Sequence, residues 1–126
     1  AAKGSNVSVY VSTFYTEGGS PEFDEGIKAW LNEDSTAMTN NGGNDTIAAV
    51  TAMGYDAYYT ALEVLKNAGS LDLAEIKAAL PSTTYTGVSG SIAFGEQGDA
   101  VRDTAYIKAF DSSTDAWTLE TVQTVS

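Results

Sequence analysis

The spacing of apolar residues changes at Pro81, and this change constrains the fold more than any other feature of the sequence. Before Pro81, most apolar side chains recur every three or four residues, which is the period of an amphipathic helix. After it, apolar residues alternate with a period of two, as in strands, in "SIAF", "TAYIKAF" and "AWTLETVQTV". The intervening "GEQGDAVRD" and "DSSTD" have the composition of turns. The sequence therefore predicts an α/β chain that ends in antiparallel strands.

The part before Pro81 predicts one strand followed by helices. Valines that alternate with polar residues predict a strand over 7–14. Ser20 is a suitable cap for an amphipathic helix over 21–32. The polar segment 32–45 is predicted to be a loop, and a capping box predicts a short helix over 72–80.

The longest helix is predicted near residues 45–68, between a cap at Asn44 or Asp45 and a glycine at its end. One face carries mostly small residues that suit close packing: Ile47, Val50, Gly54, Ala57, Ala61, Leu65 and Ala68. A bulkier flank carries Tyr55, Tyr58, Tyr59 and Leu62. The tyrosines of this flank serve either in packing or in stacking on a ligand, and the sequence leaves both roles open.

The charge of the chain excludes nucleic acid as a partner. There are 17 acidic and 6 basic side chains, which gives a formal net charge of -11. Such a surface repels phosphate backbones and anionic lipid headgroups, and Arg102 with a few scattered lysines forms no basic stripe.

The sequence has neither histidine nor cysteine, so the usual general base, thiolate metal site, cysteine nucleophile and disulfide framework are all missing. "NNGGND" and "DSSTD" contain oxygen ligands, but neither has the spacing of a calcium loop. "GVSG" lacks the spacing and the histidine partner of a nucleophile elbow. We therefore expect no enzyme, no metal site and no cofactor, and predict that residues 1–126 form a single domain.

Two segments carry a family resemblance. "MGYDAYYTALEVLKNAGSLDLAEIKAAL" and "YTGVSGSIAFGEQGDAVRDTAYIKAF" resemble the C-terminal part of branched-chain-amino-acid-type substrate-binding proteins of ABC transporters, the type I periplasmic-binding-protein family. The opening "VYVSTFYTEGGSPEFDEGIKAWL" is similar to a segment in which that family passes from one lobe to the other. The matching positions are Tyr55, Asp56, Ala57, Gly87, Gly90, Ile92, Phe94, Gly98 and Asp99. Gly95 replaces a common aspartate, which loosens one turn.

The resemblance implies a partial lobe of the type I fold, with helices packed on a small sheet and a C-terminal antiparallel hairpin. It implies a C-terminal fragment that lacks about the first two thirds of a receptor. Such a receptor lies outside the cytoplasm, in the periplasm or on the cell surface, with a lipid anchor in the missing N-terminal region. It closes two lobes on a small ligand, such as a branched-chain amino acid, and delivers it to an ABC transporter permease. The alternative is a sensing module of the same fold that signals instead.

Four residues are candidates for contact with that ligand. Phe14 and Tyr15 end the first predicted strand, where the resemblance implies a hinge crossing, and strand ends line the crevice in open α/β lobes. Val50 and Met53 lie in the first turns of the long helix, which the resemblance makes a wall of the apolar pocket. Core packing is the alternative role for each.

We predict that the isolated chain folds but self-associates, most simply as a homodimer. Removing neighbouring strands exposes apolar faces and unpaired edges, and identical chains offer identical edges. Light scattering at high protein concentration measures the mass directly. A strict monomer would show that the chain is self-sufficient.

Overall fold

A computed structural model describes residues 4–124 of the chain. Its order is strand, four α-helices, a short 3₁₀ turn and five strands. The elements before Pro81 are β1 (Tyr10–Thr13), α1 (Pro21–Glu33), α2 (Ser35–Asn40), α3 (Ala49–Ala68) and α4 (Leu73–Ala79). The others are the 3₁₀ turn (Leu80–Ser82), β2 (Thr84–Gly87), β3 (Gly90–Phe94), β4 (Ala100–Val101), β5 (Thr104–Asp111) and β6 (Ala116–Thr124). The predicted mixed α/β class is confirmed.

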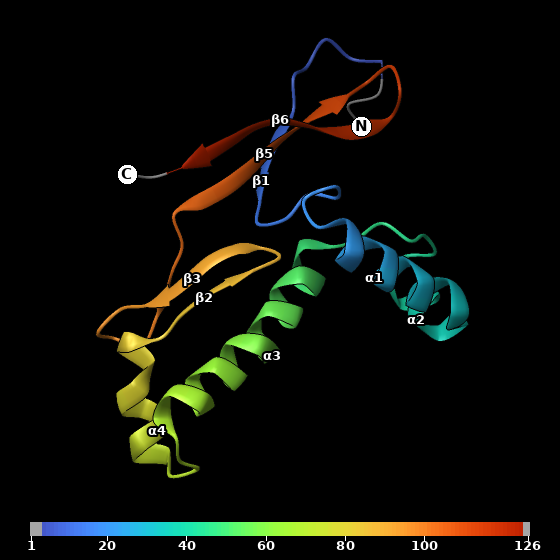
Figure 1. The fold of residues 1–126 in the computed structure, drawn as a ribbon. Helices are drawn as coiled ribbons and strands as arrows, with labels where there is room; N and C mark the ends of the chain where they lie inside the picture. Colours follow the sequence, from blue (N-terminus) through green and yellow to red (C-terminus); the bar gives the residue numbers. More distant parts are fainter. Residues whose placement is uncertain (1–3, 125–126) are drawn as a thin grey trace.

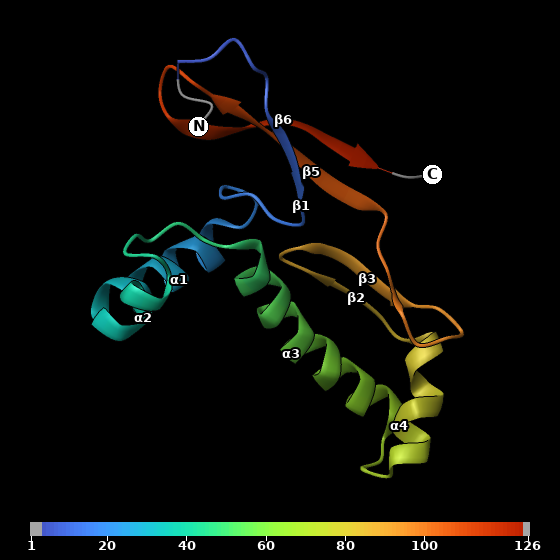
Figure 2. The ribbon, with the colours of Figure 1, turned by 180° about the vertical axis from the view of Figure 1, so that it is seen from behind.

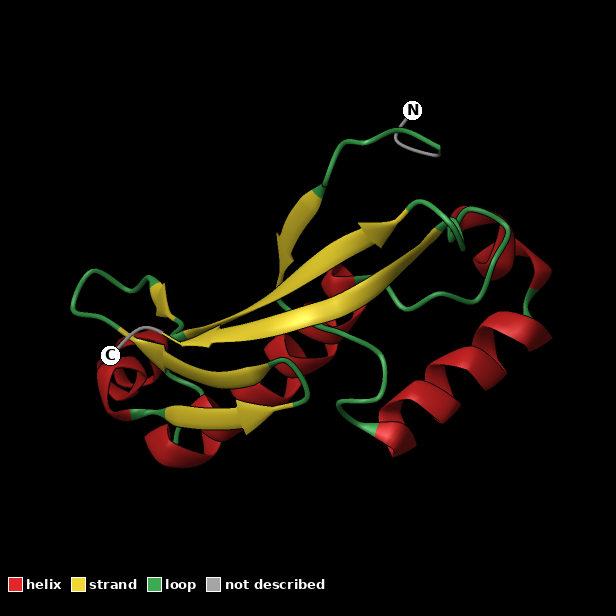
Figure 3. Ribbon diagram, turned by 90° about the horizontal axis from the view of Figure 1, so that it is seen from above, coloured by secondary structure: helices red, strands yellow, loops and turns green. Residues whose placement is uncertain are grey.

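The strands form two separate antiparallel sheets. The first, here called the terminal sheet, has the order β1-β5-β6, and the second has the order β2-β3-β4. The second sheet packs along α3 and, with the four helices, makes up what we call the helical part. Figures 1 and 2 show the terminal sheet standing apart from the helices, and Figure 3 shows its long hairpin from above. The predicted antiparallel C-terminal strands are therefore present.

The core of the helical part lies where the N-terminal ends of α1 and α3 meet. Tyr15, Phe23, Ile47 and Ala52 form one buried cluster. The rings of Tyr15 and Phe23 meet edge to face with centroids 5.5 Å apart, a favoured aromatic geometry. Only a few large side chains are buried, so this core is small.

The long helix begins later than predicted. Neither Asn44 nor Asp45 caps α3, which starts at Ala49 with no side-chain cap. The Asn44 side chain instead accepts a hydrogen bond from the Thr46 backbone, and the Ile47 amide donates to Glu17. These bonds keep residues 44–47 out of the helix. Its end is as predicted, because Gly69 adopts the left-handed conformation that glycine favours.

The deeply buried stripe of α3 is also not the predicted one. Ala52, Asp56, Thr60 and Val64 are buried. The predicted face lies beside this stripe, and its members Ala57, Ala61 and Leu65 line an open apolar cavity instead. The reason is that the β2–β3 hairpin packs along the Asp56 side of the helix.

Part of the predicted loop 32–45 is a helix. Asp34 caps α2 by accepting hydrogen bonds from the backbone amides of Thr36 and Ala37. Ala37 is buried and fixes the helix against its surroundings. The prediction of an uninterrupted loop was wrong because capping and one buried alanine outweigh the polar composition.

The sequence also misjudged three strands. One of them is β4, because its two residues lie within the predicted turn 95–103 and form a strand by pairing with β3. The strand predicted over 7–14 is assigned only from Tyr10 to Thr13, although the Val9 carbonyl still accepts a hydrogen bond from Phe110. Strand β2 was not predicted, because "TYTG" offers one apolar residue and no alternation. It forms because its backbone pairs with β3.

One buried carboxylate joins α3 to the β2–β3 turn. Asp56 accepts hydrogen bonds from the amides of Val88 and Ser89, at 2.8 and 2.7 Å, and from the Ser89 hydroxyl. Gly87 lies against the same carboxylate, and a Cβ atom there would overlap it. The φ angle of Gly87 is not in the left-handed region, so space alone requires the glycine.

We expect Gly87→Ala to lower the free energy of unfolding by about 2 kcal/mol or more, because the methyl group forces Asp56 away from its donors. Urea denaturation measures the loss. Gly26→Ala in α1 is the matched control, since a Cβ atom there meets nothing within 4 Å. That control should be neutral or stabilising by up to about 1 kcal/mol. Equal stability of the two variants would refute the close packing at Gly87.

Candidate functional site

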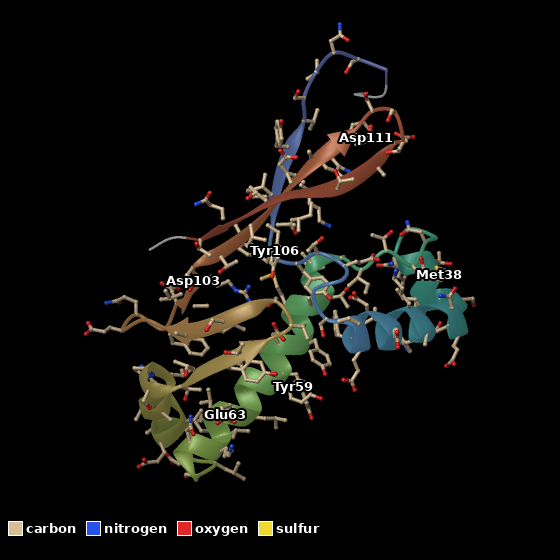
Figure 4. All side chains as sticks on the ribbon, turned by 45° about the horizontal axis from the view of Figure 1, so that its top comes forward. Met38, Tyr59, Glu63, Asp103, Tyr106 and Asp111 are labelled. Carbon is tan, nitrogen blue, oxygen red and sulfur yellow. The ribbon has the colours of Figure 1, made fainter. Side chains whose placement is uncertain are left out.

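The chain passes twice between the helical part and the terminal sheet. It leaves β1 through residues 14–20 and enters β5 through Arg102 and Asp103. Because β1 and β5 pair in antiparallel register, with Thr13 opposite Tyr106, the two crossings lie side by side. Figure 4 shows Asp103 and Tyr106 at this junction. In the part of the chain that the structure describes, extensive contacts between elements fall on one side of the junction or the other.

A cation–π contact joins the two crossings. The guanidinium of Arg102 lies over the ring of Phe14, 5.4 Å from its centroid. The same guanidinium donates hydrogen bonds to the carbonyl and hydroxyl oxygens of Ser89, at 3.0 and 2.7 Å. The Ser89 hydroxyl in turn donates to Asp56. A continuous polar chain therefore runs from α3, through the hairpin turn, to the ring of Phe14.

Tyr15 points the other way, into the core. It is only 2% exposed, and its hydroxyl donates to an Asp24 carboxylate oxygen at 2.5 Å. The other oxygen of Asp24 accepts from the Gly18 amide. Burial, followed by the hydrogen bond and charge of Asp24, raises the pKa of Tyr15. In this chain Tyr15 holds the crossing segment in place.

Val50 and Met53 occupy different surroundings. Val50 is 73% exposed in the first turn of α3. Met53 lines an apolar cavity of about 500 Å³ between α3, α4 and the second sheet. Arg102 lines the same cavity, and its guanidinium also lies over the ring of Phe14. The structure thus places Phe14 against Arg102, Met53 in the cavity that Arg102 also lines, Tyr15 in the core and Val50 in solvent.

Arg102 and Ser89 were not singled out as site residues from the sequence. Arg102 is the only arginine of the chain, and that rarity was the available signal. Ser89 is buried, but it lies in a glycine-rich turn and resembles an ordinary turn residue. The contact between Arg102 and Ser89 depends on how the hairpin folds, and no spacing in the sequence predicts it.

Residues 4–124 show neither a candidate metal site nor a membrane-spanning helix. No group of three or more acidic side chains in this range is arranged to hold a metal ion. No helix in it is long and apolar enough to cross a membrane.

No protein-family model matches the sequence, and no curated protein does. Among solved structures, the chain is similar to a leucine-binding protein, LivK, from Thermotoga maritima. The superposition has a TM-score of 0.65 at 24% sequence identity, and it covers 93% of this chain and 31% of the other. The chain therefore spans about a third of the length of that protein. The likeness shows the fold, a partial lobe of the type I periplasmic-binding-protein kind.

We predict that Tyr15→Phe reduces the loss of stability at alkaline pH. An unfolded tyrosine loses its proton near its ordinary pKa of 10, whereas folded Tyr15 keeps it. The free energy of unfolding therefore falls as pH rises above 10, and the variant lacks this contribution. Denaturation at pH 8, 10 and 11 measures the slope, with Tyr58→Phe, an exposed hydroxyl, as the control. An unchanged slope in Tyr15→Phe would contradict the predicted role of burial.

Proposed function

We propose that the chain is part of an extracytoplasmic substrate-binding component of an ABC transporter. In the whole protein, two lobes close on a small ligand such as a branched-chain amino acid, and the closed form engages a permease. A lipid anchor in an N-terminal region would hold the protein at the membrane. The likeness to a leucine-binding protein supports the class of ligand.

The paired crossings are the observation that carries this proposal. Two adjacent connections, joined by Phe14 and Arg102, let the helical part rotate against the terminal sheet while the two stay connected. A short connection of two residues precedes β5, so the rotation axis is confined to the junction. A clamp of this kind buries its ligand between the lobes.

Exposed apolar surfaces support the proposal that the chain is part of a larger lobe. The cavity beside Met53 is lined mostly by apolar side chains from α3, α4 and the second sheet. On the terminal sheet, Trp117, Leu119 and Val122 are each close to half exposed. Isolated domains rarely leave so much contiguous apolar surface in water. We propose that further strands and helices of the whole protein cover these surfaces, and that a second copy covers them when the chain is alone.

Within the proposed cleft, Phe14 is the first candidate for ligand contact, because its ring is 41% exposed at the junction. Met53 follows, as a wall of the apolar cavity. Tyr15 acts by fixing the crossing segment through Asp24. Val50 contributes only if the second lobe reaches the first turn of α3.

Thermal-shift screening of the full-length protein against the common amino acids tests the proposal. A specific ligand raises the free energy of unfolding by RT ln(1 + [L]/Kd), and this raises the melting temperature. Leucine, isoleucine or valine is expected to give the largest shift. No shift with any of the amino acids would exclude the proposed ligand class.

Phe14→Ala in the full-length protein should then weaken the binding of that ligand by about tenfold, because it removes an exposed ring from the junction. Isothermal titration calorimetry measures the affinity, and urea denaturation measures the stability. Tyr58→Ala, which removes a more exposed ring on α3, is the control. Unchanged affinity in Phe14→Ala would show that the ring only packs on Arg102.

A further inference from the structure

A second concave site lies on the other side of α3 from the apolar cavity that Met53 lines. It is an open groove of about 520 Å³ between the N-terminal end of α1, the first half of α3 and strand β2. We call it the tyrosine groove. Its lining comprises Ser20, Glu22, Phe23, Gly26, Ile27, Tyr55, Tyr85, Thr86, Gly87 and Val88. Its volume is in the usual range for small-molecule sites.

Three of the lining residues are aromatic, namely Phe23, Tyr55 and Tyr85. Tyr59, which does not line the groove, connects the rings of Tyr55 and Tyr85. The rings of Phe23 and Tyr55 have centroids 5.0 Å apart, and those of Tyr55 and Tyr59 are 4.8 Å apart. The Tyr59 and Tyr85 rings are nearly parallel, with centroids separated by 6.4 Å. Figure 4 shows Tyr59 on α3, beside the β2–β3 hairpin. Tyr55 and Tyr59 remain 40% and 38% exposed, so these two rings are not part of the buried core.

The charge around the groove is negative. Glu22 lines it and is exposed, and no lysine or arginine is among its lining residues. A hydrogen bond with Tyr59 and then burial raise the pKa of Tyr55, and the charge of Glu22 contributes least. Burial raises the pKa of Tyr85, to which the charges of Asp56 and Glu63 contribute. The carboxylate of Glu22 therefore places a negative charge at the rim of the groove, beside the rings of Phe23 and Tyr55.

These features define the chemistry of an occupant. Ring faces attract a cation within about 6 Å of the centroid, and quaternary ammonium groups suit aromatic walls because they shed water easily. A carboxylate at the rim adds Coulomb attraction. Gly26 leaves room for methyl groups beside α1, because a Cβ atom there would meet nothing within 4 Å.

We propose that the tyrosine groove binds a small organic cation of the quaternary-ammonium type. The lining of the groove meets the crossing segment only at Ser20 and includes none of Phe14, Met53 and Arg102, so the groove is an additional site and not the cleft of the proposed transport function. Its occupant bridges α1 and β2, and binding would stabilise the helical part.

Titration of the chain with choline, and with its neutral isostere 3,3-dimethylbutan-1-ol, tests the proposal. Choline should bind about fivefold more tightly, because the two probes share a shape and differ in charge. Backbone amide NMR shifts should map the binding to Gly26, Thr86 and Gly87. This experiment needs no amino acid, so its outcome is independent of the proposed transport function.

Two variants and their two controls separate the contributions. Tyr85→Leu should weaken choline binding at least threefold, whereas Tyr10→Leu, which changes an exposed ring on the terminal sheet, should not. Glu22→Gln should weaken it about threefold, while Glu25→Gln, on the same helix but outside the lining, leaves it unchanged. Both glutamates are exposed, so these two variants keep the test valid even if Tyr85→Leu fails to fold.

Two outcomes would overturn the proposal. Equal affinity for choline and its neutral isostere would make the groove an apolar surface with no preference for cations. Shifts spread over the acidic surface, with equal effects of Glu22→Gln and Glu25→Gln, would show attraction of the cation by net charge alone.

Discussion

The arrangement of this chain depends on the buried carboxylate of Asp56. A buried charge without partners costs several kcal/mol, whereas one that accepts three hydrogen bonds from a tight turn fixes that turn in place. The turn residue Ser89 then presents two oxygens to Arg102, and Arg102 faces Phe14. One interaction in the helical part thus determines where the chain crosses to the terminal sheet.

The long helix α3 serves two different surfaces at once. Its buried stripe holds the hairpin through Asp56, and on one side of that stripe Met53 and Ala57 line the apolar cavity. On the other side Tyr55 and Tyr59 line up with Tyr85. Small residues on the cavity side of α3 permit other helices or strands to pack closely. Tyrosines on the opposite side leave aromatic rings with hydroxyl groups at the surface. The same helix therefore supports both the proposed lobe packing and the tyrosine groove.

Much of the fold could be predicted because its signals are local. Pro21 begins α1, Gly69 ends α3, and the aspartate at position 72 caps α4 as expected. Helix α2 and strand β2 escaped prediction because their stability comes from a buried alanine and from backbone pairing. Of the candidate site residues, Phe14 lies against the guanidinium of Arg102, and Met53 lines the same cavity as Arg102. The orientation of Tyr15 depends on its hydrogen bond to Asp24, nine residues away in the sequence.

The sequence by itself determined the α/β class, the order of most helices and strands, and the acidic surface, because periodicity, capping and charge act over a few residues. The tertiary structure decided which stripe of α3 is buried, how the two crossings meet, and which tyrosines form a groove. These features require residues from distant segments to lie within a few ångströms. Asp56 and Ser89, for example, are 33 positions apart in the chain and share one hydrogen bond through the hydroxyl and another through the amide.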